Sequence, residues 1–183
     1  MKGLLTENLD LEGKKILLRL DLNVPLLDKS ITEISRIEKI IPTIKFLLNK
    51  KSKIIILSHI GRPKGKIVPE LSLEPIAKKL SEILNKEVIF FKDKINDQLS
   101  NKLELIPNGS VIMLENIRFN EGEEKNDSNF AKKLSEFGEI YINDAFSCSH
   151  RAHASLVAIT KFLPSYFGIQ IIEEINVLKK LTS

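Results

Sequence analysis

The chain has 183 residues, 43% of them hydrophobic and 28% charged, with a formal net charge of +4. These values are typical of one soluble domain, and they exclude a disordered chain and a membrane-spanning one, since no apolar run reaches the length of a membrane helix. Lysines are scattered among acids without a basic, aromatic-rich stripe, so nucleic acid binding is not favoured. No signal peptide pattern opens the chain, and Cys148 has no internal disulfide partner, so we expect a cytoplasmic protein.

Two apolar periodicities alternate from end to end. Short, continuously apolar segments predict buried strands at 14–20, 53–57, 87–91, 110–114 and 139–143. Helical spacing predicts helices at 35–50, 71–86, 97–105 and 128–138, and a further amphipathic helix near the end of the chain. Strands that alternate with helices in this way indicate an α/β fold, with a parallel sheet covered by helices on both faces.

The ends of these helices carry recognisable signals. Ser35 and Ser72 are candidate N-caps of the first two helices, and Asp127 or Ser128 opens the fourth, which Gly138 is expected to end. Pro42 predicts either a kink or a later start for the first helix. The charged segment 120–127 is expected to be a solvated loop.

Polar side chains follow four of the five predicted strands. Ligands of parallel sheets bind at the carboxyl ends of the strands, so these side chains should gather at one edge. Only five of the 28 basic residues are arginine, and four of those five lie in these segments or at the start of the first helix. Arginine is the side chain that binds phosphate and carboxylate with two parallel hydrogen bonds. The segments in question carry Asp21, Asn23, Arg36, His59, Gly61, Arg62, Arg118, Asp144, His150, Arg151 and His153.

We therefore expect a clamp for a small, multiply charged anion. Four guanidinium groups in one place repel each other unless a ligand or acids neutralise them. In this interpretation Asp21 and Asn23 orient arginines or bind ligand hydroxyl groups, and Gly61 lets the backbone approach the ligand.

Each of these residues also has a structural interpretation. Asp21 could cap a turn, Arg118 could pair with Glu115 or Glu121, and His153 could be a buried structural histidine. Metal binding by His150 and His153 is not favoured, because zinc requires three or four ligands.

A thiol nucleophile is also conceivable. It would combine Cys148 with His150 and Asp144. Spacing alone does not support it, and a lone cysteine is more often buried and inert.

Five segments, in order, closely resemble the N-terminal half of the phosphoglycerate kinase family. They are KKILLRLDLNVPL, SRIEKIIPTIKFLL, IIILSHIGRPKGK, LENIRFNEGEEKND and INDAFSCSHRAHAS. The resemblance covers nearly the whole chain and implies a Rossmann-like three-layer domain that binds 3-phosphoglycerate or 1,3-bisphosphoglycerate. Two departures are Leu22, where the family often has Phe, and Ser147-Cys148-Ser149, where it often has Gly-Thr-Ala.

The resemblance also implies roles for individual residues. Arg36 would act in catalysis, near the phosphoryl group in flight. The other expected substrate-binding residues are Asp21, Leu22, Asn23, His59, Ile60, Gly61, Arg62, Arg118 and Arg151. Of these, Arg118 and Arg151 would bind the 3-phosphate. No metal ligand is expected in this chain.

The resemblance implies a division into domains as well. Residues 1–170 would form the phosphoglycerate-binding domain, and 171–183 would begin the interdomain helix. The C-terminal domain, which binds Mg-ADP or Mg-ATP in the family, has no counterpart here, so we expect an inactive half of a monomeric enzyme. The alternative is a standalone anion-binding module without catalysis.

Overall fold

A seven-stranded, all-parallel sheet forms the centre of the molecule, in the order β1-β9-β8-β2-β5-β7-β6. The computed structural model describes residues 3–6, 8–27, 30–31 and 33–182. The strands are β1 (Gly3–Leu4), β2 (Lys15–Leu20), β5 (Lys53–Leu57), β6 (Val88–Phe91), β7 (Val111–Leu114), β8 (Ile140–Asp144) and β9 (Ser165–Phe167). A separate antiparallel pair consists of β3 (Leu26–Leu27) and β4 (Ser30–Ile31).

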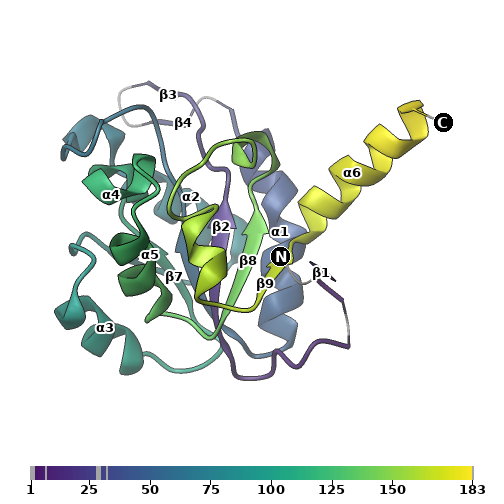
Figure 1. Ribbon diagram of the computed structural model, residues 1–183, viewed down its shortest axis with the longest axis horizontal. Coiled ribbons are helices and arrows are strands. Elements are labelled where there is room, and N and C mark those ends of the chain that lie inside the picture. The colour runs from purple at the N-terminus through teal and green to yellow at the C-terminus, as the bar shows by residue number, and fades with distance from the viewer. Residues whose placement is uncertain (1–2, 7, 28–29, 32, 183) are drawn as a thin grey trace.

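Helices cover both faces of the sheet, as Figure 1 shows. They are α1 (Ser35–Asn49), α2 (Glu74–Leu84), α3 (Asp97–Glu104), α4 (Glu121–Glu124), α5 (Ser128–Ser135) and α6 (Ile169–Thr182). The predicted α/β class, with a parallel sheet between two helical layers, is therefore confirmed. Among the described residues, no helix is long and apolar enough to cross a membrane.

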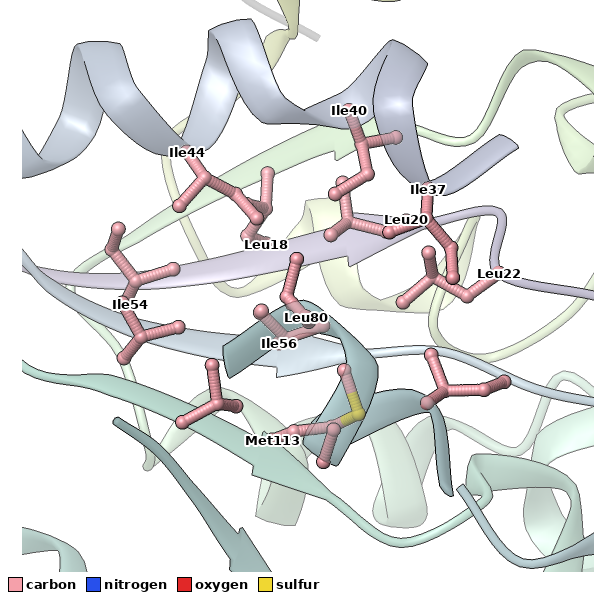
Figure 2. Packing of buried hydrophobic residues seen from close by; sticks show 14 of the residues in the cluster. Leu18, Leu20, Leu22, Ile37, Ile40, Ile44, Ile54, Ile56, Leu80 and Met113 are labelled. Atoms are coloured by element: carbon pink, nitrogen blue, oxygen red, sulfur yellow. The ribbon is translucent and has the colours of Figure 1, made fainter. Parts of the chain in front are cut away.

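The hydrophobic core is divided by the sheet into two clusters. Side chains alternate along a strand, so neighbours in sequence point to opposite faces. Leu18 and Ile56 pack with α1 and α2 (Figure 2), whereas Leu17 and Ile55 pack with α3 and α5. Burial on both faces explains why the central strands are apolar without interruption.

The five predicted strands are all present, each within one residue of its predicted bounds. The sheet also contains β1 and β9, which the sequence did not predict because each has only two or three residues. The segment 120–127 is not simply a solvated loop, since it contains α4 and the fully buried Glu123.

Two predicted N-caps are wrong in detail. The side chain of Ser35 caps nothing, because Ile34 is the N-cap of α1, and the helix runs on through Pro42. The next helix, α2, begins at Glu74 instead of 71 and has Leu73 as its N-cap, whose amide the carboxylate of Glu115 accepts at 2.9 Å. The hydroxyl of Ser72 still accepts the amide of Glu74 at 3.3 Å, so Ser72 contributes to the first turn. The predicted Asp127 cap is confirmed by its bond from the amide of Phe130 at 2.7 Å.

The fourth helix also ends early. α5 stops at Ser135, and Gly138 lies beyond it, just before β8. A Cβ atom at Gly138 would lie 2.7 Å from Cγ of Leu17, so close packing is what requires this glycine.

Candidate anion-binding site

A cavity of about 190 Å³ opens beside the carboxyl ends of β2, β5 and β8. It is lined by ten residues, of which sequence reasoning proposed eight. They are Asp21, Asn23, Arg36, His59, Gly61, Arg62, Arg118, Ser147, Cys148 and Arg151. The parallel topology brings together these residues from distant segments, because each segment leaves its strand or helix at the same edge of the sheet.

Asp21 connects two parts of the cavity wall. Its carboxylate accepts hydrogen bonds from the guanidinium of Arg36 and from the hydroxyl of Ser147. Asp21 is 7% exposed, whereas the Arg36 side chain is 43% exposed. The expectation that Asp21 orients an arginine thus agrees with this geometry, and Arg36 is held at the cavity by a partner that a ligand can replace.

Asn23 fixes the loop that follows β5. Its side-chain oxygen accepts the backbone N–H of Gly61 at 3.1 Å. Gly61 has φ +65°, and a Cβ atom there would lie 2.8 Å from the side chain of Leu71. Glycine is needed at this turn for both reasons.

Arg118 is buried at the cavity with unused hydrogen-bonding capacity. Its residue is 3% exposed, and Nη1 donates to the carbonyl of Gly61 at 2.8 Å. Nε and Nη2 have no hydrogen-bond partner among the described residues, and the Glu124 carboxylate is 3.8 Å from Nε. Burial lowers the pKa of Arg118. A buried guanidinium with two unpaired nitrogens is a costly arrangement that an anion would relieve.

His59 is held from behind by an arginine that the sequence analysis did not place in the site. Nη2 of Arg19 lies 2.9 Å from Nδ1 of His59, and Arg19 is fully buried within β2. Burial, followed by the charges of Arg19 and Arg118, lowers the pKa of His59 to about 2. The imidazole is therefore neutral at physiological pH.

Two predicted residues, Leu22 and Ile60, are not among those that line the cavity, although for Ile60 only the backbone was expected to bind. The side chain of Leu22 is fully buried in the core (Figure 2), and its amide donates to the hydroxyl of Ser58 at 3.1 Å. Ile60 is 4% exposed and also packs in that core. Their side chains therefore support the loops of the site without lining it.

Asp144 was expected among the polar residues of this edge, and it does end β8, but it does not line the cavity. It is fully buried and accepts the hydroxyl of Thr43 at 2.5 Å and the amide of Ile171 at 3.0 Å. Its burial raises its pKa. The same contacts leave no basis for a Cys148–His150–Asp144 set. Arg118 likewise pairs with neither Glu115 nor Glu121, since its acidic neighbour is Glu124.

Three potential metal ligands do meet in the described part of the chain. Asp21, His59 and Cys148 offer ligand atoms within 4.8 Å of one another. The donor set does not suit a cation, because Nδ1 of His59 faces Arg19 and the Asp21 carboxylate is paired with Arg36. The arginines that line the same cavity would also repel a metal ion.

A larger groove, of about 830 Å³, lies elsewhere, between α2, β6 and α4. Its polar side chains Glu115 and Asn116 already have hydrogen-bond partners within the chain. Glu115 accepts from Ser72 and Leu73, and Asn116 donates to the carbonyls of Ile60 and Leu71. We therefore place the functional site at the smaller, arginine-lined cavity.

Fold and cavity together define a Rossmann-like α/β domain whose parallel sheet carries an arginine-lined cavity at its carboxyl edge. The family model of phosphoglycerate kinase matches residues 6–183. The chain belongs to the phosphoglycerate kinase family, and it corresponds to the N-terminal domain.

Individual relatives agree. The chain is 48% identical over 177 residues to a phosphoglycerate kinase of a Wolbachia strain from Drosophila simulans, covering 97% of this chain and 44% of the relative. It is 51% identical over 172 residues to that of Geobacter metallireducens, covering 93% and 43%. The chain thus spans less than half the length of these curated relatives.

Solved structures show the same fold. The phosphoglycerate kinase of Coxiella burnetii matches with a TM-score of 0.85 and 37% identity, over 94% of this chain and 43% of that one. The enzyme of Pyrococcus horikoshii matches with a TM-score of 0.87 and 31% identity, over 97% and 45%. The predicted membership and fold are therefore confirmed.

Proposed function

We propose that this chain is the 3-phosphoglycerate-binding half of a phosphoglycerate kinase. The complete enzyme would reversibly transfer a phosphoryl group between 1,3-bisphosphoglycerate and ADP in glycolysis, giving 3-phosphoglycerate and ATP. The observation that carries the proposal is Arg118, which is buried at the cavity with Nε and Nη2 unpaired. A phosphate oxygen is a strong acceptor for such a donor.

The cavity suits the charge of this substrate. 3-Phosphoglycerate carries a carboxylate at one end and a phosphate at the other, and both can accept bidentate arginine bonds. We assign Arg118 and Arg151 to the 3-phosphate, and Arg36 to the carboxyl end. His59, Arg62 and the backbone at Gly61 would complete the contacts, and Asn23 and Asp21 would bind the glycerate.

The chemistry needs no general base in this chain. In the direction that consumes ATP, the attacking group is a carboxylate that is already ionised at neutral pH. Catalysis then consists of aligning two anions and neutralising the charge on the group in transfer. Arg36 supplies that charge from this half. Mg-ADP or Mg-ATP would be held by a second domain, to which α6 would lead as the start of the interdomain helix.

The proposal extends to the protein's setting. We propose a monomeric cytoplasmic enzyme whose partners are its substrate and its own nucleotide domain, with no nucleic acid or membrane partner. A standalone anion-binding module would share the cavity, and it would differ in gaining no activity when a nucleotide domain is supplied.

Isothermal titration with 3-phosphoglycerate, with 2-phosphoglycerate as control, tests substrate binding. We expect saturable binding of the 3-isomer and at least tenfold weaker binding of the 2-isomer, since moving the phosphate breaks its contacts with the arginines. Equal affinities would reject 3-phosphoglycerate as the ligand. Absence of binding by either isomer would reject the substrate site in this chain.

A matched pair of variants tests whether the cavity is the binding site. Arg62 lines the cavity and is exposed, and Lys66 is an exposed cation of the same loop that does not line it. Losing a charged hydrogen bond costs about 1.5–3 kcal/mol, so Arg62→Ala should weaken 3-phosphoglycerate binding about tenfold or more. Lys66→Ala should change it less than about twofold. Equal effects would indicate non-specific attraction.

A further inference from the structure

The arrangement behind His59 assigns a hydrogen-bonding role that the cavity alone does not define. His59 lines the cavity, and Nη2 of Arg19, which does not line it, lies 2.9 Å from Nδ1 of the His59 ring. A neutral imidazole has one N–H donor and one acceptor nitrogen, and which nitrogen carries the proton is set by the partner of the other.

Arg19 determines which ring nitrogen of His59 carries the proton. A guanidinium has five N–H donors and no acceptor, and it stays protonated in proteins. Nη2 of Arg19 lies 2.9 Å from Nδ1 of His59, so Nδ1 must be the acceptor. The proton of the neutral ring then belongs on Nε2. A second proton is opposed by burial and by the arginines nearby.

Arg19 is itself fixed in direction. Its Nε donates to the hydroxyl of Ser155 at 3.0 Å, and Nη1 donates to the carbonyl of Leu20. The Ser155 hydroxyl donates in turn to the Glu123 carboxylate at 2.6 Å. Glu123 is fully buried, and the Ser155 hydroxyl connects its carboxylate to the fully buried Arg19. The guanidinium thus has its planar fork held in place.

We propose that Arg19 is a positioning residue that holds His59 as a neutral Nε2–H donor directed at the bound substrate, with Ser155 and Glu123 holding Arg19. The proposal rests on the proposed function for the identity of the substrate only. Arg19 contacts no ligand and acts through His59. The result is a permanent donor at this point of the cavity, which complements an acceptor-only group such as phosphate.

The surroundings of His59 are mixed in charge. The groups that face it are Arg19 of β2, Asp21 of the following loop, Arg118 after β7, and Cys148, Arg151 and His153 after β8. Cations predominate, and the acidic Asp21 is paired with Arg36. A neutral donor is therefore the form of His59 that these groups stabilise.

The first experiment is a ¹⁵N NMR spectrum of the histidine ring nitrogens in the ligand-free chain at pH 7. We expect a protonated Nε2 and an unprotonated, hydrogen-bonded Nδ1 for His59. An Nδ1–H ring, an averaged mixture of tautomers or an imidazolium would overturn the proposal. No variant or ligand is needed, so this result stands whether or not 3-phosphoglycerate binds.

A second spectrum tests the part played by Arg19. Arg19→Met alone would strand the buried charge of Glu123, so the variant to use is Arg19→Met combined with Glu123→Gln. Its His59 ring should show both tautomers. A folded variant that keeps pure Nε2–H would show that Arg19 does not position the ring. If the variant does not fold, Ser155→Ala, which removes the Nε contact of Arg19 together with the Ser155–Glu123 hydrogen bond, should still broaden the His59 ring signals, and unchanged signals would contradict the proposal.

Amide substitutions test the direction of donation. The amide nitrogen of Gln can reach the place of Nε2, whereas that of Asn reaches only the place of Nδ1. His59→Gln should therefore bind 3-phosphoglycerate about tenfold more tightly than His59→Asn. Equal losses would contradict donation through Nε2. If the unaltered chain binds no 3-phosphoglycerate, the proposed function fails, and the ring spectrum alone decides the tautomer.

Discussion

Two buried arginines at this site are compensated to different degrees. Arg19 bonds to Ser155, Leu20 and His59, whereas Arg118 leaves Nε and Nη2 unpaired. A buried guanidinium with two nitrogens that lack hydrogen-bond partners destabilises the ligand-free fold, and residues that bind ligands often carry such a cost. Arg118→Met should therefore leave the free energy of unfolding unchanged or raise it by about 1 kcal/mol. The same change should weaken 3-phosphoglycerate binding at least tenfold. Urea denaturation and calorimetric titration measure the two effects.

The control for this prediction is Arg19, whose three guanidinium nitrogens all have hydrogen-bond partners. Arg19→Met removes a buried cation that Ser155 connects to the buried Glu123, and it should lower the free energy of unfolding by about 3–5 kcal/mol. If Arg118→Met is as destabilising as Arg19→Met, Arg118 is a structural residue, and its two nitrogens without hydrogen-bond partners do not serve to bind an anion.

At the scale of elements, Thr43 joins α1, β8 and α6. Its hydroxyl donates to Asp144 at the end of β8 and accepts the amide of Ile169 at 3.3 Å. The same helix carries Arg36 at its start. Thr43→Val keeps the shape and removes both bonds, so it should lower the free energy of unfolding by about 1–3 kcal/mol. Hydrogen exchange should become faster for the amides of 169–172 and stay unchanged in α2.

Thr160→Val is the matched control. That hydroxyl bonds only to the nearby carbonyl of Val157, so its loss should cost less than about 0.5 kcal/mol. Uniformly faster exchange throughout the Thr43→Val protein would mean that the residue acts on global stability and not on the connection to α6.

The elements also show what the sequence could predict. The strands were recognisable because each runs through the core and is apolar on both faces, as in KIIIL at 53–57. From the sequence alone, the carboxyl-edge rule predicts that Arg36, Arg62, Arg118 and Arg151 lie together. β1 and β9 were not predicted because strands of two or three residues show no periodicity. They form because β9 pairs with β8 and β1 pairs with β9.

The roles of Asp144 and Arg19 depend on tertiary contacts that the sequence does not reveal. Asp144 follows the same pattern as Asp21, a carboxylate at the end of a buried strand, yet it points to Thr43 and the start of α6. Nothing local distinguishes the two. Arg19 was counted as an arginine but not assigned to the site, because its position inside a strand gives no hint that it reaches His59. The one available signal was its charge within an otherwise apolar strand, since buried charges are rarely without a partner.

In the proposed function, the whole molecule supplies one half of a reaction that brings two anions together. The residues that line the cavity lie between 21 and 151, and the relatives that the chain matches are more than twice as long as the chain. Val177 and Leu181 on α6 are 55% and 77% exposed. Phosphoryl transfer requires a donor aligned with the bound carboxylate, and in the proposed function a second domain holds Mg-ATP. We therefore expect this chain, mixed with 3-phosphoglycerate and Mg-ATP, to bind the former and to form no ADP above background. ³¹P NMR follows both nucleotides, and the full-length Geobacter metallireducens protein serves as the positive control. Turnover by this chain alone would refute the division into two halves, and binding without turnover would support it.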